Sequence, residues 1–476
     1  MTIFKIVKSA WRPASLASLL LAAPLVGART ALCVDIEHVQ PVTVSNPLVN
    51  GLLQPAPGSP PYSSEFLGFN IQGFLDTGSS GVVISELTAF LLDLPRTPGV
   101  VHTDVAIGGE THFDVSPPLT LRISGTNDPD WGNLETYETV YNQVYAPMRL
   151  QLGPTDTELS IFDVYGMPAM MGKTVVIDPR QAIPLLLSAP TYIYNPGTPF
   201  NEETEYTNPG IPETSHHVQM SYADFDRFTQ TIGPDELPAD PPQLNHNPFI
   251  GPNPLLQLED NPPPDNTPPV TMSFGGHEAR GSFLLDTGGA ASFISSRMAA
   301  SMHIRFVEGT QGTDDPQLEI FDPENPDEPP LPLENQFVVQ LQGLAGVVTW
   351  AGFYADELVL QTLEGSDDLA DPDNIRYRGT PILVEDFSVR DPLTDESLIL
   401  DGVLGMNYLL DSLFITPDFE ILDERESPYN WVTFDEPTGI LGLDLVVVPE
   451  PGSIAMAGCG LVLLAAYAWR RRQRQK

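Results

Sequence analysis

The 476-residue sequence contains two cysteines, Cys33 and Cys459, and each lies in a terminal segment. The body between them therefore has no disulfide bond and no thiol, which excludes cysteine-ligated zinc. The glycine-rich signatures of phosphate and dinucleotide sites and the H-E-x-x-H pattern of zinc proteases are also missing. We expect no metal and no cofactor.

Basic residues are scarce. The chain has 22 Lys and Arg against 63 Asp and Glu, a net charge of −41. Nine of the basic residues stand at the two ends, so the stretch from Val34 to Gly452 holds 13 basic and all 63 acidic residues, a net charge of −50. This charge excludes nucleic acid as a partner, because binding to phosphates needs a basic surface.

Long regular helices are not expected, because proline makes up 49 of the 476 residues. Short runs rich in β-branched and aromatic residues recur instead, broken by Gly, Pro, Asn and Asp. Such punctuation is typical of mostly-β domains, and the length suggests two of them.

The N-terminal segment has the pattern of a secretory signal peptide. Three basic residues, Lys5, Lys8 and Arg12, precede an apolar run from Ala14 to Ala28, and no acidic residue occurs there. We predict that residues 1–33 form this signal peptide.

The C-terminal segment, residues 448–476, combines three features: Pro449-Glu450-Pro451, an apolar run from Ser453 to Trp469, and an Arg cluster at 470–474. Together they resemble the PEP-CTERM sorting signal of diderm bacteria. That resemblance implies a single transmembrane helix, recognition by an exosortase-type enzyme and cleavage near the motif. A plain single-pass anchor is the alternative, and both place the body outside the cytoplasm.

The body contains an internal repeat. Residues 73–85 and 282–295 both run from apolar residues through Asp-Thr-Gly to small residues, a second apolar stretch and Ser. Their aspartates, Asp76 and Asp286, are 210 positions apart. A strand-like stretch precedes each Asp-Thr-Gly, and a helix-compatible one follows it. We therefore predict two β lobes, at 34–232 and 270–447. Residues 233–269 contain 12 prolines in 37 positions, a composition that favours an extended linker.

Two Asp-Thr-Gly turns that face each other would bring two carboxylates close together. Thr supplies a hydroxyl to hold the partner loop, and Gly permits tight backbone geometry beside a carboxylate. Since both acids cannot ionise at short range, the pair shares one proton. One carboxylate can then act as general base on a water molecule while the other protonates a substrate carbonyl oxygen.

These motifs resemble the catalytic loops of pepsin-like and retropepsin-like aspartic proteases. In that family a hydrophobic-hydrophobic-Gly strand also passes behind each Asp loop, and the matches here are Val164-Tyr165-Gly166 and Val403-Leu404-Gly405. The resemblance implies a bilobal, pseudo-symmetric β fold with the active-site cleft between the lobes and one catalytic Asp from each. It also implies that the residues after Asp76 and Asp286 form the active-site scaffold: Thr77, Gly78, Ser79, Thr287, Gly288 and Gly289.

The chain departs from the family at one scaffold position. Two-lobed members usually carry Ser or Thr after Asp-Thr-Gly, and the hydroxyl hydrogen-bonds a catalytic carboxylate. Ser79 matches this pattern, whereas Gly289 has no hydroxyl. The loss should move the pH range of the pair upward. The flap is not identified by sequence, although residues 107–113, with Gly108-Gly109, form one candidate hairpin.

The sequence thus predicts an exported, monomeric aspartic endopeptidase that is anchored in the membrane by its C-terminal helix or released by processing. Its expected partner is a polypeptide substrate. Two alternatives stay open: a peptide-binding module without catalysis on the same fold, and a structural protein of the cell surface or matrix.

Overall fold

The computed structural model describes residues 34–37, 39–43, 45–55, 70–79, 81–99, 101–106, 109–117, 119–123, 141–142, 151–154, 163–181, 188–224, 246–258, 262–343, 346–390, 396–410, 412–415, 421–425 and 427–446. Two predicted segments lie outside these residues: the signal peptide (1–33), and the sorting segment with its transmembrane helix (448–476).

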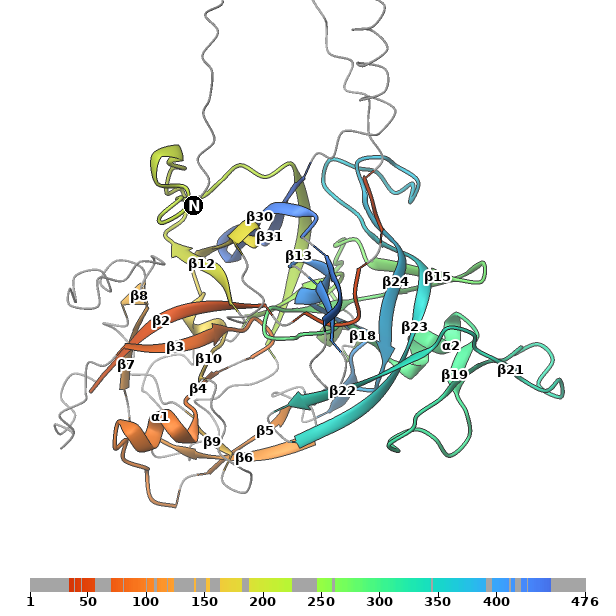
Figure 1. Cartoon of the computed structure of the whole chain (residues 1–476), viewed down its shortest axis with the longest axis horizontal. Helices are drawn as coiled ribbons and strands as arrows, with labels where there is room; N and C mark the ends of the chain where they lie inside the picture. The colour runs from red at the N-terminus through yellow and green to blue at the C-terminus, as the bar shows by residue number, and fades with distance from the viewer. Residues whose placement is uncertain are drawn as a thin grey trace, which may run out of the picture. The chain divides into compact units, whose positions relative to one another are not determined.

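The described residues are mostly β, which confirms the mostly-β part of the predicted fold class (Figure 1). Within the described ranges, helices are confined to two six-residue segments, α1 (Glu86–Leu91) and α2 (Ser296–Ser301), and to short 3-10 turns. The strands up to residue 224 are β1 (Val34–Glu37), β2 (Asn46–Pro55), β3 (Asn70–Leu75), β4 (Val82–Val83), β5 (Val101–Ala106), β6 (Gly109–Val115), β7 (Leu119–Ile123), β8 (Tyr141–Asn142), β9 (Gln151–Pro154), β10 (Asp163–Tyr165), β11 (Thr174–Ile177), β12 (Ser188–Tyr194) and β13 (His216–Asp224).

The remaining strands are β14 (His246–Ile250), β15 (Val270–Phe274), β16 (His277–Gly281), β17 (Phe283–Asp286), β18 (Phe293–Ile294), β19 (Ile304–Phe306), β20 (Leu318–Ile320), β21 (Leu331–Pro332), β22 (Phe337–Gly343), β23 (Gly346–Leu360), β24 (Ile375–Val384), β25 (Ser388–Arg390), β26 (Ser397–Ile399), β27 (Gly402–Gly405), β28 (Ser412–Ile415), β29 (Ile421–Arg425), β30 (Tyr429–Asp435) and β31 (Ile440–Leu445). Among the described strands, 24 are linked by hydrogen-bonded pairing into one network.

The two repeats fold locally in the same way. In each, a strand (β3 or β17) leads into the Asp-Thr-Gly turn, a two-residue strand (β4 or β18) follows, and a helix (α1 or α2) ends the unit. Ser85 and Ser295 are the helix N-caps, and the side chain of each accepts a hydrogen bond from the backbone N–H three residues later. The two repeats therefore share one spacing in the sequence because each places its turn, its short strand and its helix cap in the same order, with the cap at the same distance from the turn along the chain.

A later strand inserts beside each Asp turn. β10 pairs in parallel with β3 and antiparallel with β4, and β27 pairs in the same way with β17 and β18. At the end of each inserted strand, the backbone of the Asp loop passes directly over a glycine. A Cβ on Gly166 would overlap the carbonyl oxygens of Ser79 and Gly81, and one on Gly405 would overlap those of Gly289 and Ala291. The close backbone approach explains why both strands end in Gly.

Strand pairs also join the two sequence halves. β1 pairs in parallel with β24, β11 pairs with β30, and β13 pairs with both β31 and β14. Residues 246–250, inside the segment expected to be a linker, are thus strand β14 of the network, which also pairs with β17. This part of the Pro-rich segment is sheet because Phe249 and Ile250 are buried, at 0% and 1% exposure.

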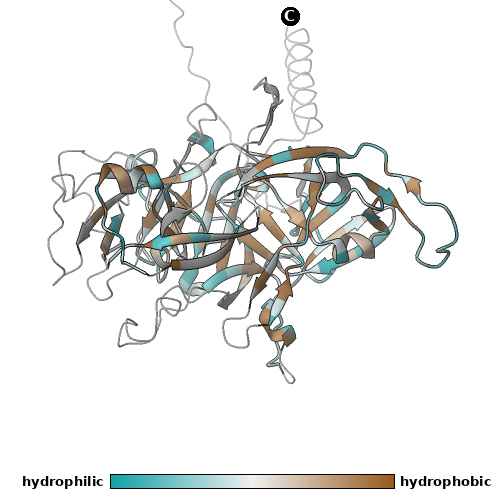
Figure 2. Ribbon diagram, turned by 90° about the horizontal axis from the view of Figure 1, so that it is seen from below, coloured by the Kyte–Doolittle hydropathy of each residue, from teal (hydrophilic) through white to brown (hydrophobic). Residues whose placement is uncertain are grey.

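A single hydrophobic cluster lies beneath both Asp turns. It includes Leu75 and Tyr165 from one repeat and Leu285 and Leu404 from the other, all exposed by 1% or less. Figure 2 shows the hydrophobic stretches along the strands of the network. Burial of these side chains fixes which face of each strand points inward and hence where each following Asp emerges.

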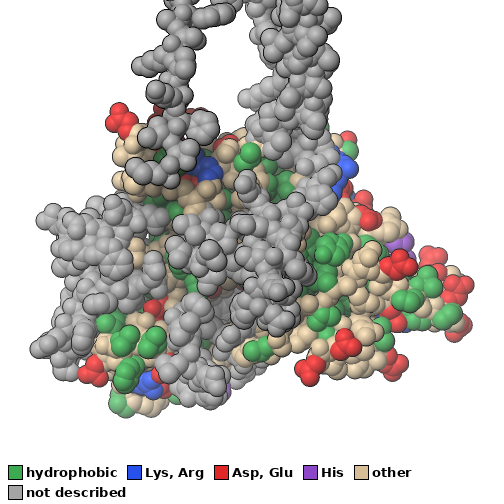
Figure 3. Space-filling view, viewed as in Figure 1, with side chains coloured by type: hydrophobic (Ala, Val, Ile, Leu, Met, Phe, Trp, Pro, Cys, Tyr) green, Lys and Arg blue, Asp and Glu red, His purple; other side chains and the backbone are tan. Residues whose placement is uncertain are grey.

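Acidic side chains outnumber basic ones on the face of the described residues seen in Figure 3, as the sequence predicts. Within the part of the chain that the structure describes, no helix combines the length and hydropathy needed to cross a bilayer.

The glycine contacts give a test of the inserted strand. We expect Gly166→Ala to lower the free energy of unfolding by about 3 kcal/mol or more, because the Asp loop backbone cannot yield to a methyl group. Gly309→Ala is the control, since Gly309 has open space around it and a φ of 79°. It should cost only the left-handed backbone penalty of about 1 kcal/mol. Urea unfolding measures both, and equal losses would contradict this account.

Candidate active site

The two Asp-Thr-Gly turns contact each other through their threonines. The backbone N–H of Thr77 donates to the hydroxyl of Thr287 at 3.0 Å, and the N–H of Thr287 donates to the hydroxyl of Thr77 at 3.0 Å. Each hydroxyl in turn donates across the contact, Thr77 to the carbonyl of Leu285 and Thr287 to the carbonyl of Leu75 at 2.7 Å. Both threonines are buried, so these bonds replace water on every polar atom involved.

The threonine contact brings the two carboxyl groups together. Each carboxyl group lies against the glycine of the opposite loop, Asp76 against Gly288 and Asp286 against Gly78, and both acids are partly exposed to solvent. The glycines make this approach feasible. A Cβ on Gly78 would lie 2.8 Å from the Asp286 carboxyl carbon, and one on Gly288 would overlap the Asp76 carboxyl group.

Backbone N–H groups also point at the carboxylates. Asp76 Oδ1 accepts from the N–H of Gly78 at 2.8 Å and from that of Ser79 at 3.1 Å. Asp286 Oδ1 accepts from the N–H of Gly288 at 2.9 Å. These donors favour the ionised form of each acid.

Desolvation nevertheless dominates the titration of the pair. Burial among the loop atoms raises the pKa of both carboxyl groups above 3.8, and the charge of Asp286 together with its hydrogen bond raises the pKa of Asp76 further. The N–H donors of both loops oppose these increases without cancelling them. The pair therefore holds a proton at a pH where an exposed aspartate has lost it.

The structure corrects the expected role of Ser79. Its hydroxyl donates to the carbonyl oxygen of Gly81 at 3.1 Å rather than to a carboxylate, and only its backbone N–H reaches Asp76. The hydroxyl faces Gly81 because the chain turns there into β4. Gly289 holds the same position in the second loop and lies against the carboxyl group of Asp286, since a Cβ there would be 2.7 Å from Asp286 Oδ2.

The other predicted scaffold residues lie behind the turns. Val164 and Tyr165 on β10 pair with Phe74 and Leu75, and Val403 and Leu404 on β27 pair with Leu284 and Leu285. The N–H of Asp76 donates to the carbonyl of Tyr165 at 3.0 Å. Gly166 and Gly405, which end the two strands, lie directly under the Asp loops.

Two buried polar residues near the site escaped the sequence analysis. Asn247 on β14 donates from Nδ2 to the carbonyls of Thr77 and Gly78. Asp163 on β10 accepts from the N–H of Ser85 and the hydroxyl of Thr88, both at 2.7 Å, and so ties the cap of α1 to the inserted strand. Sequence offers little signal for Asn247, because it stands in an Asn-Pro dipeptide that occurs seven times in the chain.

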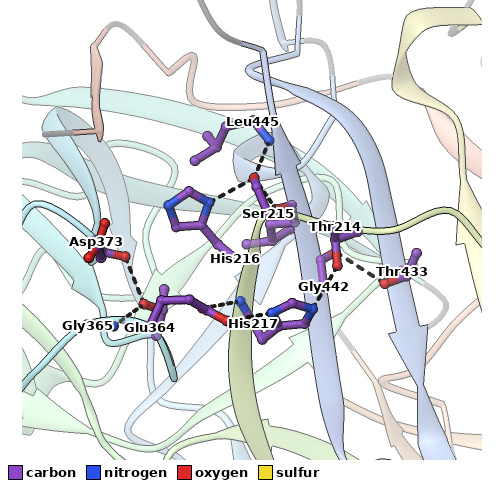
Figure 4. A network of polar contacts seen from close by, with 12 residues as sticks. Thr214, Ser215, His216, His217, Glu364, Gly365, Asp373, Thr433, Gly442 and Leu445 are labelled. Atoms are coloured by element: carbon purple, nitrogen blue, oxygen red, sulfur yellow. Dashed lines mark hydrogen bonds and ion pairs between the residues drawn. The ribbon is translucent and has the colours of Figure 1, made fainter. Parts of the chain in front are cut away.

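A separate polar network surrounds two adjacent histidines on β13 (Figure 4). Nδ1 of His217 lies 2.7 Å from Glu364 Oε1, and Nε2 lies 3.2 Å from the hydroxyl of Thr214. Nδ1 of His216 lies 2.9 Å from the hydroxyl of Ser215. These contacts tie β13 to the loop after β23. Among the residues that the structure describes, no three His, Cys, Asp or Glu side chains are grouped to hold a metal ion.

Comparison with known proteins assigns the C-terminal end. Residues 447–472 match the family model of the PEP-CTERM protein-sorting motif, which confirms the prediction made from Pro449, Glu450 and Pro451. The motif indicates an exported protein that is recognised by an exosortase at its C-terminus and placed at the cell surface or outside the cell. No curated protein matches the chain. The matched residues lie after the last described strand, β31.

The threonine contact can be tested by mutation. Thr77→Val leaves the N–H of Thr287 and the carbonyl of Leu285 without partners, so we expect a loss of about 2–4 kcal/mol in the free energy of unfolding. Thr77→Ser keeps the hydroxyl and should cost clearly less. In a double-mutant cycle, Thr77→Val and Thr287→Val should be strongly non-additive, because they break one shared set of bonds. Additive losses would show that the loops are held independently.

Asp163 predicts a pH dependence of stability. Burial raises its pKa from 3.8 to about 6 against the hydrogen bonds from Ser85 and Thr88, so folding favours the protonated acid. Relative to Asp163→Asn, the wild type should be most stable below about pH 4 and lose about 3 kcal/mol as the pH rises through 6. Thermal or urea unfolding across this range measures the difference. A difference that stays constant with pH would contradict the raised pKa.

Proposed function

We propose that the protein is an exported aspartic endopeptidase in which Asp76 and Asp286 hydrolyse peptide bonds through a water molecule. The observation that carries this proposal is the reciprocal threonine contact, which sets two carboxyl groups at the solvent boundary, each against the glycine of the opposite loop. Buried acids that serve only the fold are paired with cations or donors instead, as Asp178 is with Arg180 at 2.9 Å. Two acids facing each other gain nothing for stability.

In the proposed mechanism, the pair enters the reaction with one proton between its two acids. The ionised carboxylate takes a proton from water as the water oxygen attacks the carbonyl carbon of the substrate peptide. The protonated carboxyl group donates its proton to the carbonyl oxygen, which gives a neutral tetrahedral diol. Collapse of this diol breaks the C–N bond: one diol hydroxyl returns its proton to the carboxylate that had protonated the carbonyl oxygen, and the proton taken from water passes to the leaving nitrogen. The two acids then hold one proton again.

The proposal includes the bilobal arrangement that the resemblance implies, with lobes at 34–232 and 270–447 and the substrate bound between them. Two similar local units, each built of strand, Asp turn, short strand and helix, support it. The charge of −50 over the body should favour basic or neutral peptides at encounter. We also propose that the C-terminal apolar run anchors the body in the membrane until an exosortase processes it.

The proposal predicts inhibitor-sensitive peptide cleavage. The full-length protein, Asp76→Asn and Asp286→Asn should be assayed on a peptide library from acidic to neutral pH, with and without a statine-type transition-state inhibitor. Each substitution removes the shared charge and should lower kcat by about 10³-fold or more. Asp356→Asn is the control, since this carboxylate binds only the turn at Gly275 and should leave cleavage unchanged.

Cleavage that survives in either Asp variant would refute the two-acid mechanism. A wild type that binds the inhibitor and cleaves no peptide would identify the body as a peptide-binding module. A wild type that does neither would favour a structural role at the cell surface.

A further inference from the structure

Asn247 lies at the boundary between the two Asp loops. It stands on β14, which pairs with β17 through Phe249 and Leu284, two residues before Asp286. Its side chain nevertheless reaches the other loop. Nδ2 donates to the carbonyl oxygen of Thr77 at 3.0 Å and to that of Gly78 at 3.2 Å. The residue is 1% exposed, so water does not compete for these bonds.

The two carbonyl groups belong to the two peptide units that bind Asp76. The carbonyl of Thr77 and the N–H of Gly78 form one planar unit, and the carbonyl of Gly78 and the N–H of Ser79 form the next. Both N–H groups donate to Asp76 Oδ1, at 2.8 and 3.1 Å. A donor at the carbonyl end of a peptide unit fixes its plane and polarises its N–H. The side-chain amide of Asn247 therefore acts on the N–H groups of both Gly78 and Ser79.

The dipeptide Asn247-Pro248 has a counterpart beside the other Asp strand, Asn46-Pro47. Phe249 pairs with the residue two positions before Asp286, and Leu48 pairs with the residue two positions before Asp76. The residues two positions earlier on these strands are Asn247 and Asn46, and a proline follows each. The same dipeptide thus occupies the same register beside each Asp strand.

We infer that Asn247 is a positioning residue for the Asp76–Asp286 pair: its amide group holds the two peptide units whose N–H groups stabilise the Asp76 carboxylate. The inference rests on the proposed function for its effect on cleavage, and on the geometry alone for its effect on the titration of Asp76.

The ionised form of Asp76 depends on the N–H groups of Gly78 and Ser79, because the charged groups around Asn247 do not stabilise it. The facing titratable group is Asp286, whose charge disfavours ionisation of Asp76. His246, the neighbour of Asn247 on β14, is directed at Glu436, with 3.4 Å between Nδ1 and Oε1. Among the described residues, the groups that oppose the rise in the pKa of Asp76 are the N–H groups of Gly78 and Ser79. Loss of their orientation should raise that pKa.

Removal of the amide therefore has an expected signature. In the full-length protein, Asn247→Ala should move the pH profile of kcat/KM upward by about 0.5–1 unit and lower its maximum by about tenfold. Asn247→Asp keeps the shape of the side chain and should shift the profile in the same direction, because a carboxylate facing two carbonyls repels them. This second variant covers the case in which the alanine variant does not fold.

Asn374→Ala is the matched control. Asn374 is fully buried and also donates from Nδ2 to two backbone carbonyls, those of Ser366 and Asp368, both at 3.0 Å. It lies in the loop before β24 and contacts neither Asp loop in these bonds. Its loss should lower the melting temperature and leave the pH profile in place.

The second readout is independent of catalysis. Carboxyl ¹³C chemical shifts of Asp76, assigned with Asp76→Asn, follow its protonation directly. The Asn247 variants should titrate at higher pH than the wild type whether or not any peptide is cleaved. An unshifted titration and an unshifted profile, with only the loss of stability seen in Asn374→Ala, would overturn the inference. If the wild type cleaves no peptide, the proposed function fails and the titration alone still decides the role of Asn247.

Discussion

Two buried threonines hold the centre of the structure together. Thr77 and Thr287 exchange two hydrogen bonds and donate two more to the carbonyls of Leu285 and Leu75, and together these bonds join loops 210 residues apart in the chain. The other features of the site depend on this contact, because it sets the separation of the loops from which both carboxyl groups project. The strands beneath, β3 with β10 and β17 with β27, carry the threonines to the contact and bury their apolar side chains in one common cluster.

The contact imposes an electrostatic cost. Burial raises the pKa of both acids, and the charge of Asp286 further disfavours ionisation of Asp76. The fold stabilises the charge that remains with backbone N–H groups, and Asn247 holds the peptide units that supply them. Glycines at 78 and 288 remove the side chains that would keep the carboxyl groups apart. The site is costly for stability and is built by both repeats, and this is the reason why we propose a chemical role for it.

Local features of the fold could be predicted from the sequence. The Asp-Thr-Gly turns, the helices that follow Ser85 and Ser295, and the two glycines beneath the Asp loops all depend on neighbouring residues or on backbone space. The sorting motif could be predicted for the same reason, since it is a short contiguous pattern. The fold class followed from the scarcity of long periodic segments.

Long-range partners could not be predicted. The hydroxyl of Ser79 contacts Gly81 because of the local turn, whereas the family pattern pointed to the carboxylate. Asn247 lies in a Pro-rich segment whose composition favours a linker, and its role depends on the pairing of β14 with β17. Asp163 is buried by contacts with Ser85 and Thr88, which are 75 or more positions away. The roles of Asn247 and Asp163 follow from tertiary contacts that composition and spacing do not encode.

The central claim is that Asp76 and Asp286 act as one unit held by the threonine contact. A crystal structure of the protein with a bound statine-type ligand tests this most directly. The account predicts that the ligand hydroxyl lies between the two carboxyl groups, within hydrogen-bond distance of both, with the four threonine bonds intact. Carboxyl groups that lie apart, or a ligand hydroxyl that contacts neither of them, would contradict it.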